Sequence, residues 1–338
     1  MTQAQYRNHA DMSLLLRSFM VARMLGVMAD RGVADAVPFD GAVAIEALAA
    51  TCGAQPRPLL RILRCLAAQD IFSVGPDGTV AHTGRSRLLR QDAPDSLHHA
   101  ARYWTVPGIW GAWGALDTAL AGAVPHEAAW GKPRYTFMRE HPEEARLFDA
   151  LMANFPDPRH AAIAAAYDFS GARLIADIGG GLGATLREIL SRHPAPLGVL
   201  MDREDVVRAI PPDALLNGRI RLQGGSFFEA VPAGADIYLL VCVLQNWPDD
   251  DCLRILQAIR VAMPSGARLL IGETVLEPDP TRGKVEDYIM DVQMMTIFGE
   301  ARIRTRDEFA DLMKRSNFAL TRILSTEAAG SIVEASPR

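Results

Sequence analysis

Apolar residues recur at helical spacing through much of the first hundred positions. They form a stripe over Met12–Met28, which predicts one amphipathic helix, and similar stripes predict helices over Ile45–Thr51 and Arg57–Gln69. Two short apolar runs then flank a Gly-Pro-Asp-Gly turn, which predicts a hairpin of Ile71–Val74 and Val80–Thr83. Helix, turn, helix and hairpin in this order are typical of a winged-helix domain.

A different pattern begins near residue 173, where short apolar runs alternate with stretches of helical spacing. The predicted strands are Leu174–Ile178, Leu197–Asp202, Ile220–Gln223, Ile237–Leu244 and Ala267–Glu273. Helices are predicted over Ala184–Ser191 and Asp250–Ala262. Strands that alternate with helices indicate an α/β fold with a doubly wound, mostly parallel sheet. Residues 94–165, between the two parts, are predicted to form further helices rich in aromatic side chains.

Composition and charge exclude several classes of protein. A length of 338 residues suggests two domains, and the formal net charge of −5 argues against general binding to nucleic acid or anionic membranes. No apolar run approaches the roughly 18 residues of a membrane-spanning helix. The N-terminus lacks the layout of a signal peptide, so we expect no export. The four cysteines are scattered without metal-ligand spacing, and we therefore expect reduced thiols, no metal site and a cytoplasmic location.

Three arginines leave a DNA-binding interpretation of the winged helix open. Arg57, Arg61 and Arg64 share one face of the predicted helix that would enter a DNA groove. The acidic net charge and the absence of another basic cluster favour a scaffold helix with solvated arginines instead.

A glycine-rich segment carries the clearest functional signal. Asp177–Ala184 reads Asp-Ile-Gly-Gly-Gly-Leu-Gly-Ala and lies between a predicted strand and a predicted helix. Glycines at such a junction let backbone N–H groups approach a ligand that side chains would block. Asp202 ends the next predicted strand, where a carboxylate suits the hydroxyls of a ribose. Loop and acid together predict a nucleoside site.

An NAD site also satisfies this pattern, because Gly179, Gly181 and Ala184 match the dinucleotide fingerprint. Two features argue against NAD. Asp177 directly precedes the loop, where its carboxylate suits a cationic cofactor or organises the loop. All eight histidines precede the third predicted strand, which leaves no histidine downstream as a general acid for hydride transfer.

Five motifs occur in the order found in one enzyme family. They are Asp177–Gly183, Val199–Asp202, Gly224–Phe228, Leu244–Asp250 and Arg304–Phe309. With them the chain resembles the small-molecule O-methyltransferases that use S-adenosylmethionine (SAM), including caffeic-acid-type and bacterial polyketide-tailoring enzymes. The resemblance covers nearly the whole chain and implies a Rossmann-like class I methyltransferase domain behind a mostly α-helical winged-helix dimerisation domain. The expected divisions are residues 1–100 for dimerisation, 101–165 for a helical connector and 166–338 for SAM binding.

The same resemblance implies which residues bind the cofactor. The expected set is Asp177, Gly179, Gly181, Asp202, Ser226, Phe227 and Val241. Ser226 stands where relatives carry an aspartate that accepts from the adenine amino group, so its hydrogen bond is expected to be weaker. Many relatives also carry a polar or basic residue at the position of Val241.

The catalytic position departs from the plant-type pattern. Plant members have His-Asp-Trp where this chain has Gln245-Asn246-Trp247, and an amide cannot remove the proton of an acceptor hydroxyl. Of the two acids that support that histidine, Glu273 remains and the other position is Ile303. We therefore expect Gln245 and Asn246 to act mainly by placing an acidic acceptor close to the SAM methyl group. Two roles stay open for Glu273, which either assists them or is a solvated carboxylate at the strand end and the pocket mouth.

The resemblance further implies an acceptor pocket for a flat or hydrophobic molecule. Its expected residues are Met152, Phe155, His160, Met294 and Phe298. The leading expectation is a homodimeric, SAM-dependent O-methyltransferase of a small aromatic or polyketide-like hydroxyl compound, with no nucleic-acid or membrane partner. Three alternatives stay open. They are a methyltransferase-fold enzyme that uses SAM without methyl transfer, a winged-helix DNA-binding regulator and, last, an NAD-dependent dehydrogenase.

Overall fold

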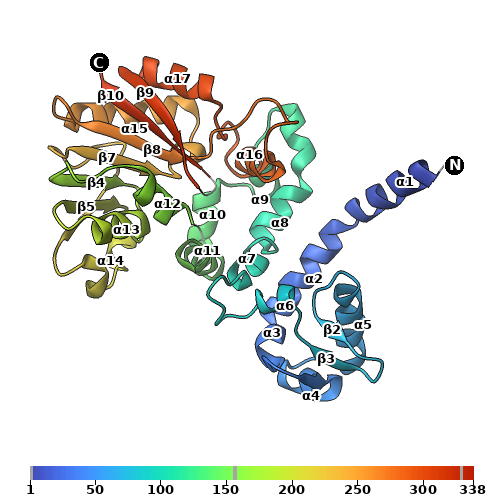
Figure 1. The fold of residues 1–338 in the computed structure, drawn as a ribbon. Coiled ribbons are helices and arrows are strands. Elements are labelled where there is room, and N and C mark those ends of the chain that lie inside the picture. Colours follow the sequence, from blue (N-terminus) through green and yellow to red (C-terminus); the bar gives the residue numbers. More distant parts are fainter. Residues whose placement is uncertain (1–2, 155–157, 328–329) are drawn as a thin grey trace. The chain divides into compact units, whose positions relative to one another are not determined.

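A computed structural model describes residues 3–154, 158–327 and 330–338 of the chain (Figure 1). The chain divides into two compact units, each made of two segments. The first comprises Met1–Gly114 and Lys132–Pro156, and the second comprises Ala115–Gly131 and Asp157–Arg338. The helical stretch between the N-terminal part and the sheet is therefore divided between both units instead of forming a connector of its own.

The first unit begins with two helices where one was predicted. Helix α1 (Gln3–Leu15) and helix α2 (Ser18–Asp30) meet at a bend of 43°. The predicted continuous helix over Met12–Met28 is therefore wrong. The two halves have different surroundings, because α2 buries Gly26, Met28 and Ala29 whereas Leu14 and Leu15 on α1 are exposed. Among the described residues no single helix is long and apolar enough to cross a membrane, and the bent pair of residues 7–15 and 18–30 reaches that length and composition only together.

The winged-helix pattern follows these helices. Helices α3 (Val33–Ala36), α4 (Ile45–Thr51) and α5 (Pro56–Ala67) pack with a small sheet in the order β1-β3-β2, made of Ala42–Ala44, Thr79–Ala81 and Ser73–Val74. The hairpin strands are thus shorter than predicted, and β1 was not predicted. Leu59, Leu63 and Leu66 line the buried face of α5, which confirms the apolar stripe.

Five further helices complete the first unit. They are α6 (Gly84–Arg87), α7 (His98–Tyr103), α8 (Pro107–Gly114), α10 (Arg134–Glu140) and α11 (Pro142–Asn154). A buried ion pair joins Arg134 to Glu144, and Glu144 also accepts the Gly108 N–H at 3.1 Å. Because each oxygen of this carboxylate has a donor, the pair ties α8, α10 and α11 together without leaving a charge unsatisfied.

The second unit contains a seven-stranded sheet in the order β6-β5-β4-β7-β8-β10-β9. Its strands are β4 (Leu174–Ile178), β5 (Leu197–Asp202), β6 (Ile220–Gly224), β7 (Ile237–Val241), β8 (Arg268–Glu273), β9 (Phe318–Ser325) and β10 (Ser331–Pro337). The first five are parallel and β10 is antiparallel to both its neighbours, which confirms a mostly parallel sheet. Strand β7 ends three residues before the predicted Leu244, because Cys242 has a φ of +55° and the chain turns there.

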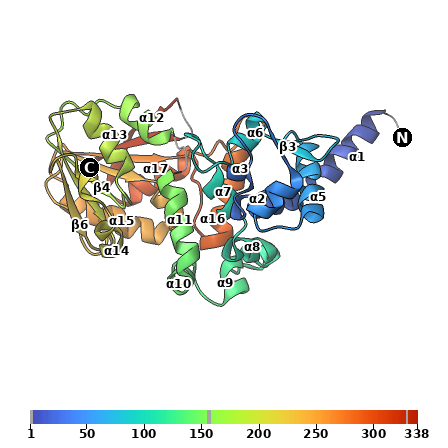
Figure 2. The same ribbon diagram turned by 90° about the horizontal axis from the view of Figure 1, so that it is seen from below.

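Helices cover both faces of this sheet (Figures 1 and 2). On one face lie α12 (Arg159–Ala166), α13 (Ala184–Arg192) and α14 (Glu204–Arg208), and on the other lie α15 (Asp249–Ala262) and α17 (Arg306–Arg315). Successive strand residues point to opposite faces, so that Leu239 packs toward α13 and Leu240 toward α15. Both faces are buried, which explains why these strands are continuous apolar runs. The unit also contains η1 (Leu116–Ala121), α9 (Pro125–Trp130), η2 (Pro212–Leu215), η3 (Leu244–Asn246) and α16 (Val285–Phe298).

Candidate cofactor and acceptor site

The candidate site lies at the carboxyl ends of the parallel strands. After β4, the next two strands in the chain, β5 and β6, are added on one side of β4. The following strand, β7, pairs with β4 on its other side. Strand order therefore reverses between β4 and β7, which is the point where open α/β sheets bind ligands. The glycine loop follows β4 at this point, and η3 follows β7.

Backbone conformation explains the glycines of the loop. Gly179, Gly181 and Gly183 have φ values of +68°, +57° and +81°, which favour residues without a Cβ. Gly180 has an ordinary φ, but a Cβ there would lie 2.4 Å from an oxygen of Asp177 and 2.5 Å from a methyl carbon of Leu200. A Cβ on Gly181 would meet no atom within 4 Å, so the space above this residue is open to a ligand.

Asp202 connects the loop to the end of β5. Its Oδ2 accepts the Gly181 N–H at 2.8 Å, and its Oδ1 accepts the Arg203 N–H at 2.7 Å. The side chain is half-buried, and each carboxylate oxygen retains a second lone pair. Asp202 therefore holds the loop and keeps lone pairs free to accept, so the predicted hydrogen bonds to a ribose stay a prediction.

Asp177 is a buried carboxyl group beneath the same loop. It is 1 % exposed, and no donor among the described residues reaches either oxygen with hydrogen-bond geometry. Burial, and then the nearby charge of Asp202, raise the pKa of Asp177 to about 7, although the Leu186 N–H offsets part of the rise. A cation brought to this loop would stabilise the ionised form of the carboxyl group.

The segment after β6 supplies aromatic side chains. Ser226 is half-buried, and its hydroxyl accepts the Phe228 N–H at 3.3 Å. The Phe227 ring lies beside Gly179, since a Cβ on that glycine would be 3.4 Å from its edge. Phe227, Phe228 and Trp247 pack edge to face with ring centres 4.9–6.0 Å apart. This aromatic cluster lies beside the glycine loop, and Trp247 packs within it.

The turn η3 carries the two amides at the predicted catalytic position. The Gln245 backbone N–H donates to Oε1 of Glu273 at 3.1 Å, and the Asn246 side-chain amide donates to the carbonyl of Cys242 at 3.1 Å. Val243, at the start of the turn, lies next to Gly179, because a Cβ there would be 3.0 Å from its methyl group. The structure thus brings Gln245, Asn246 and Glu273 together beside the glycine loop.

Glu273 ends β8 and is 1 % exposed. Burial raises its pKa to about 7, against the lowering effects of the Gln245 N–H and of Arg304. The group therefore changes protonation near neutral pH. Of the two roles considered for Glu273, the solvated carboxylate at the pocket mouth is inconsistent with this burial.

The predicted acceptor residues are distributed over three elements and both units. Met294 and Phe298 on α16 pack in an apolar cluster with Ile303, and α16 contacts η3. His160 on α12 forms a 2.7 Å hydrogen bond with the hydroxyl of Thr185, in the first turn of α13. Met152 lies on α11 in the first unit and is 55 % exposed. Phe155 lies outside the described residues.

Comparisons with known proteins identify the family. The sequence model of the O-methyltransferase domain matches residues 113–319. The phenazine O-methyltransferase PhzM of Lysobacter antibioticus is 35 % identical over 329 residues, which cover 96 % of this chain and 94 % of that protein. The chain belongs to the O-methyltransferase family.

Solved structures of family members agree with this assignment. The mitomycin 7-O-methyltransferase MmcR matches with a TM-score of 0.92 and 31 % identity over 100 % of both chains. The O-methyltransferase NcsB1 from neocarzinostatin biosynthesis, solved with SAM and 2-hydroxy-5-methyl naphthoic acid, matches with a TM-score of 0.81 and 26 % identity over 94 % and 96 % of the chains. The family also includes a protein of different chemistry, the aclacinomycin 10-hydroxylase RdmB of Streptomyces purpurascens, which is 31 % identical over 83 % of this chain and 76 % of its own.

The cofactor of this O-methyltransferase is SAM, and the loop fits it. The open space at Gly181, the buried and unsatisfied carboxyl of Asp177 and the acceptor positions of Asp202 suit a ligand with a cationic part and a ribose. Val241 is half-buried and its side chain packs over Gly272 of β8, so it offers the cofactor only apolar contact.

Sequence reasoning missed several residues of this site. Arg304 belongs to one of the five sequence motifs, but no role was predicted for it. It is fully buried and donates hydrogen bonds to the backbone on both sides of Gln245-Asn246. Arg159 on α12 contacts the thiol of Cys242 at the end of β7. No local pattern predicts these contacts, since the partners lie 60 and 83 residues apart in the chain.

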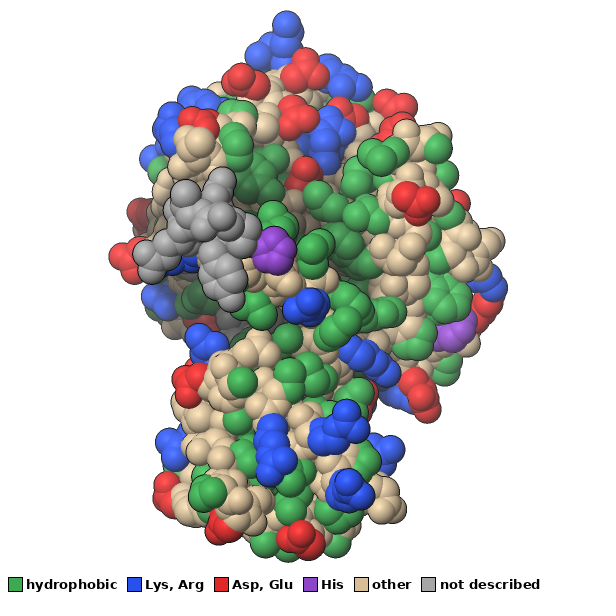
Figure 3. Space-filling model, turned by 90° about the vertical axis from the view of Figure 1, so that its right-hand side faces the viewer, with side chains coloured by type: hydrophobic (Ala, Val, Ile, Leu, Met, Phe, Trp, Pro, Cys, Tyr) green, Lys and Arg blue, Asp and Glu red, His purple; other side chains and the backbone are tan. Residues whose placement is uncertain are grey.

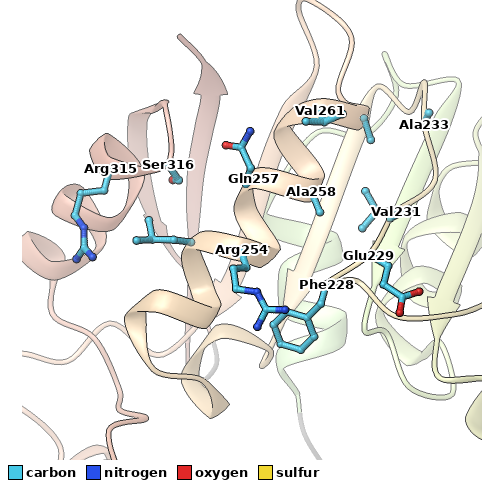
Figure 4. A pocket seen from close by; sticks show the side chains of 13 residues that line it. Phe228, Glu229, Val231, Ala233, Arg254, Gln257, Ala258, Val261, Arg315 and Ser316 are labelled. Atoms are coloured by element: carbon cyan, nitrogen blue, oxygen red, sulfur yellow. The ribbon is translucent and has the colours of Figure 1, made fainter.

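A hollow of about 730 Å³ lies elsewhere, on the outer side of α15 (Figure 4). Its lining includes Phe228, Arg254, Gln257 and Val261, and none of the loop glycines, Asp202, Gln245 or Glu273. The Arg254 guanidinium lies 4.6 Å from the centre of the Phe228 ring and is paired with Asp251. The hollow shares only Phe228 with the residues described for the candidate site.

Proposed function

We propose that this enzyme transfers a methyl group from SAM to a hydroxyl of a small aromatic or polyketide-like metabolite. The observation that carries the proposal is the turn Leu244–Asn246, which holds two amides beside the glycine loop at the switch point of the sheet. The aromatic compounds named for its relatives, a phenazine and a naphthoic acid, support an aromatic acceptor.

The chemistry we propose relies on placement of the acceptor. Bound SAM supplies an electrophilic methyl group. Gln245 and Asn246 orient the acceptor oxygen, and neither amide titrates. Glu273 holds the Gln245 backbone and keeps a proton below a pH of about 7. An acceptor that loses its own proton to water then needs only an in-line approach, and placement of this kind accounts for large rate effects.

The proposal is tested with a panel of hydroxybenzoates, hydroxynaphthoates and hydroxyphenazines incubated with the enzyme and SAM. Mass spectrometry should find a product heavier by one methyl group. For the best acceptor, Gln245→Ala should lower the rate about 10–100-fold, which is the scale of lost positioning. Leu253→Ala, in the hollow beside α15 and outside both the turn and the glycine loop, is a control and should leave the rate nearly unchanged. Equal rates for Gln245→Ala and wild type would contradict the role of the turn.

A second function is favoured by one specific observation, the absence of a base at residue 245. The 31 % identical relative named as a hydroxylase has a related sequence and a different reaction. If SAM binds tightly but no panel member is methylated, a reaction that uses bound SAM without methyl transfer replaces the first proposal.

We also propose a homodimer assembled through the first unit. Met12, Leu14, Leu15, Leu16 and Phe19 are 54–71 % exposed, and a patch of this kind is unusual on a monomer. On the face drawn in Figure 3, hydrophobic side chains are interspersed with charged ones. Light scattering of the folded protein at micromolar concentration should give the mass of a dimer, and a monomeric mass would contradict the proposal.

Two further expectations from the sequence stay predictions. The four free cysteines support a cytoplasmic location. Arg57, Arg61 and Arg64 are exposed on α5, so a gel-shift assay in low salt is the direct test of the DNA-binding alternative, and we expect no shift.

A further inference from the structure

Arg304 is a completely buried cation beside the candidate site. Its side chain is 0 % exposed, and it donates to Leu244 and Trp247, in the segment that joins β7 to α15, and to Asp249 and Cys252, in the first turn of α15. Nη1 donates to the Leu244 carbonyl at 2.9 Å, and Nη2 donates to the Trp247 carbonyl at 3.0 Å. Nη2 and Nε also reach Oδ1 of Asp249, at 2.8 and 3.2 Å.

These contacts solve the problem of burying a charge. An isolated guanidinium in the interior is strongly unfavourable unless its charge is paired and its donors are satisfied. Asp249 supplies the opposite charge, and the hydrogen bonds from Arg304 and Arg302 outweigh burial and hold its pKa below the usual value. The carbonyls of Leu244 and Trp247 and the Cys252 sulfur, 3.2 Å from Nη2, also accept from the guanidinium.

The acceptors enclose the two amides on both sides in sequence. Leu244 directly precedes Gln245-Asn246, and Trp247 directly follows them. Two further hydrogen bonds hold the same turn. Glu273 on β8 accepts the Gln245 N–H, and the Asn246 side-chain amide donates to the Cys242 carbonyl. Cys242 itself has a left-handed φ of +55°, which costs energy for a residue with a Cβ and persists only where the surroundings enforce it.

We propose that Arg304 is a positioning residue for methyl transfer, which fixes the turn so that the Gln245 and Asn246 side chains meet the acceptor in one orientation. The inference rests on the proposed function. It assigns Arg304 no contact with the acceptor or with SAM. A lysine cannot replace it, because one ammonium lacks the planar fork that spans two carbonyls and a carboxylate at once.

The neighbouring Arg302 provides a matched control. It bonds the same Asp249, at 2.9 Å, and also Glu308, but within the described residues none of its hydrogen bonds goes to the turn, and its side chain is one-third exposed. Arg304→Lys and Arg302→Lys therefore change the same residue type beside the same carboxylate, and only the first removes bonds to the turn.

The first experiment compares both variants with wild type, using the acceptor in the panel that wild type methylates fastest. Arg304→Lys should lower kcat about 10–100-fold while the Kd for SAM, from calorimetry, stays within about twofold. Arg302→Lys should keep kcat within about threefold. Hydrogen exchange should become faster in residues 243–249 for Arg304→Lys and stay unchanged there for Arg302→Lys. Wild-type kcat in Arg304→Lys would overturn the inference.

The second experiment asks whether Arg304 acts through the amide. If it does, the loss of kcat in the double variant Arg304→Lys/Gln245→Ala should be clearly smaller than the product of the two single losses, because only Asn246 is left for Arg304 to position. A double variant whose loss equals the product of the two single losses would overturn the inference. If Arg304→Lys does not fold, Asp249→Asn takes its place. We then expect a smaller loss of kcat and faster hydrogen exchange in residues 243–249. Faster hydrogen exchange with a wild-type kcat would overturn the inference.

Failure of this inference differs from failure of the proposed function. A wild-type enzyme that methylates no panel member counts against the proposed function. Unchanged hydrogen exchange in residues 243–249 of Arg304→Lys counts against the positioning role of Arg304, whether or not the wild type methylates a panel member.

Discussion

Asp177→Asn should make this enzyme more stable at alkaline pH than the wild type. The Asp177 carboxyl is buried between the glycine loop and Leu200, with the Asp202 charge nearby and no hydrogen-bond donor on its oxygens among the described residues. Asparagine has nearly the same shape and no charge. The substitution therefore removes the cost of ionising residue 177 and changes little else in the packing.

The magnitude follows from the pKa of Asp177. In the unfolded chain the carboxyl ionises near its ordinary value of 3.8, and in the folded protein near 7. Between these values the unfolded state has released the proton and the folded state retains it, so stability is greatest below pH 3.8 and falls by about 1.4 kcal/mol per pH unit until about pH 7. Asparagine has no such dependence. Between pH 5 and pH 8 the variant should gain about 2–3 kcal/mol on the wild type.

The assay is urea unfolding of both proteins without SAM at several pH values in this range. Near pH 5 the two should be similar, because the unsatisfied amide costs about 1–3 kcal/mol and offsets part of the gain. Glu273 also titrates near 7 and lowers stability in both proteins, so the difference between them isolates Asp177. Asp202→Asn is a second variant for this assay. The Asp202 charge raises the pKa of Asp177, so its removal should reduce the pH dependence of the free energy of unfolding.

The reasoning would be refuted by a difference between Asp177→Asn and wild type that is the same at pH 5 and pH 8. The cofactor gives an independent check. Because SAM is a cation, its binding favours the ionised carboxylate, so the affinity of the wild type for SAM should rise between pH 6 and 8. The affinity of Asp177→Asn should lack this rise.

Three other predictions follow from the contacts. Asp202→Ala should weaken SAM binding by about 2 kcal/mol or more, since a charged acceptor and the anchor of Gly181 are lost together, and calorimetry showing unchanged affinity would overturn the assignment. Arg134→Met should lower the free energy of unfolding by about 3–5 kcal/mol in urea titrations, because Glu144 stays buried without its partner, and a loss near zero would show that water reaches Glu144. The methylation rate should rise with pH toward the pKa of each acceptor, whereas an inflection near neutral pH that stays fixed across acceptors would indicate a titrating group of the protein, such as His160 or Glu273.

The sequence was sufficient for the parts of the fold that local patterns specify. Strands β4, β5 and β8 are apolar runs buried on both faces, and their bounds agree with the prediction to within one residue. The loop glycines were predictable because three of them need a positive φ and the fourth has no room for a Cβ. The strand ends then located Asp177 and Asp202 without any knowledge of tertiary contacts.

Other features depend on contacts between distant residues, and local patterns do not contain them. Strand β9 has no regular alternation of buried and exposed positions, and β10, which is buried at four consecutive residues (332–335), gains its place by insertion between β8 and β9. The end of β7 at Val241 depends on the left-handed Cys242, a conformation that cysteine alone does not predict. The break between α1 and α2 likewise has no proline or glycine to mark it.

The bond between Glu273 and residue 245 explains how a glutamine can stand at the proposed catalytic position without loss of the turn. Glu273 accepts from the backbone N–H of Gln245, and Arg304 donates to the carbonyls on either side, so the support of this turn involves no side chain at residue 245. The side chain can therefore change from a base to an amide while the backbone that presents it keeps its geometry. What changes is the range of acceptors. A turn that places an oxygen but cannot remove its proton selects for hydroxyls that ionise by themselves, and acidity of the acceptor then becomes part of the specificity of the enzyme.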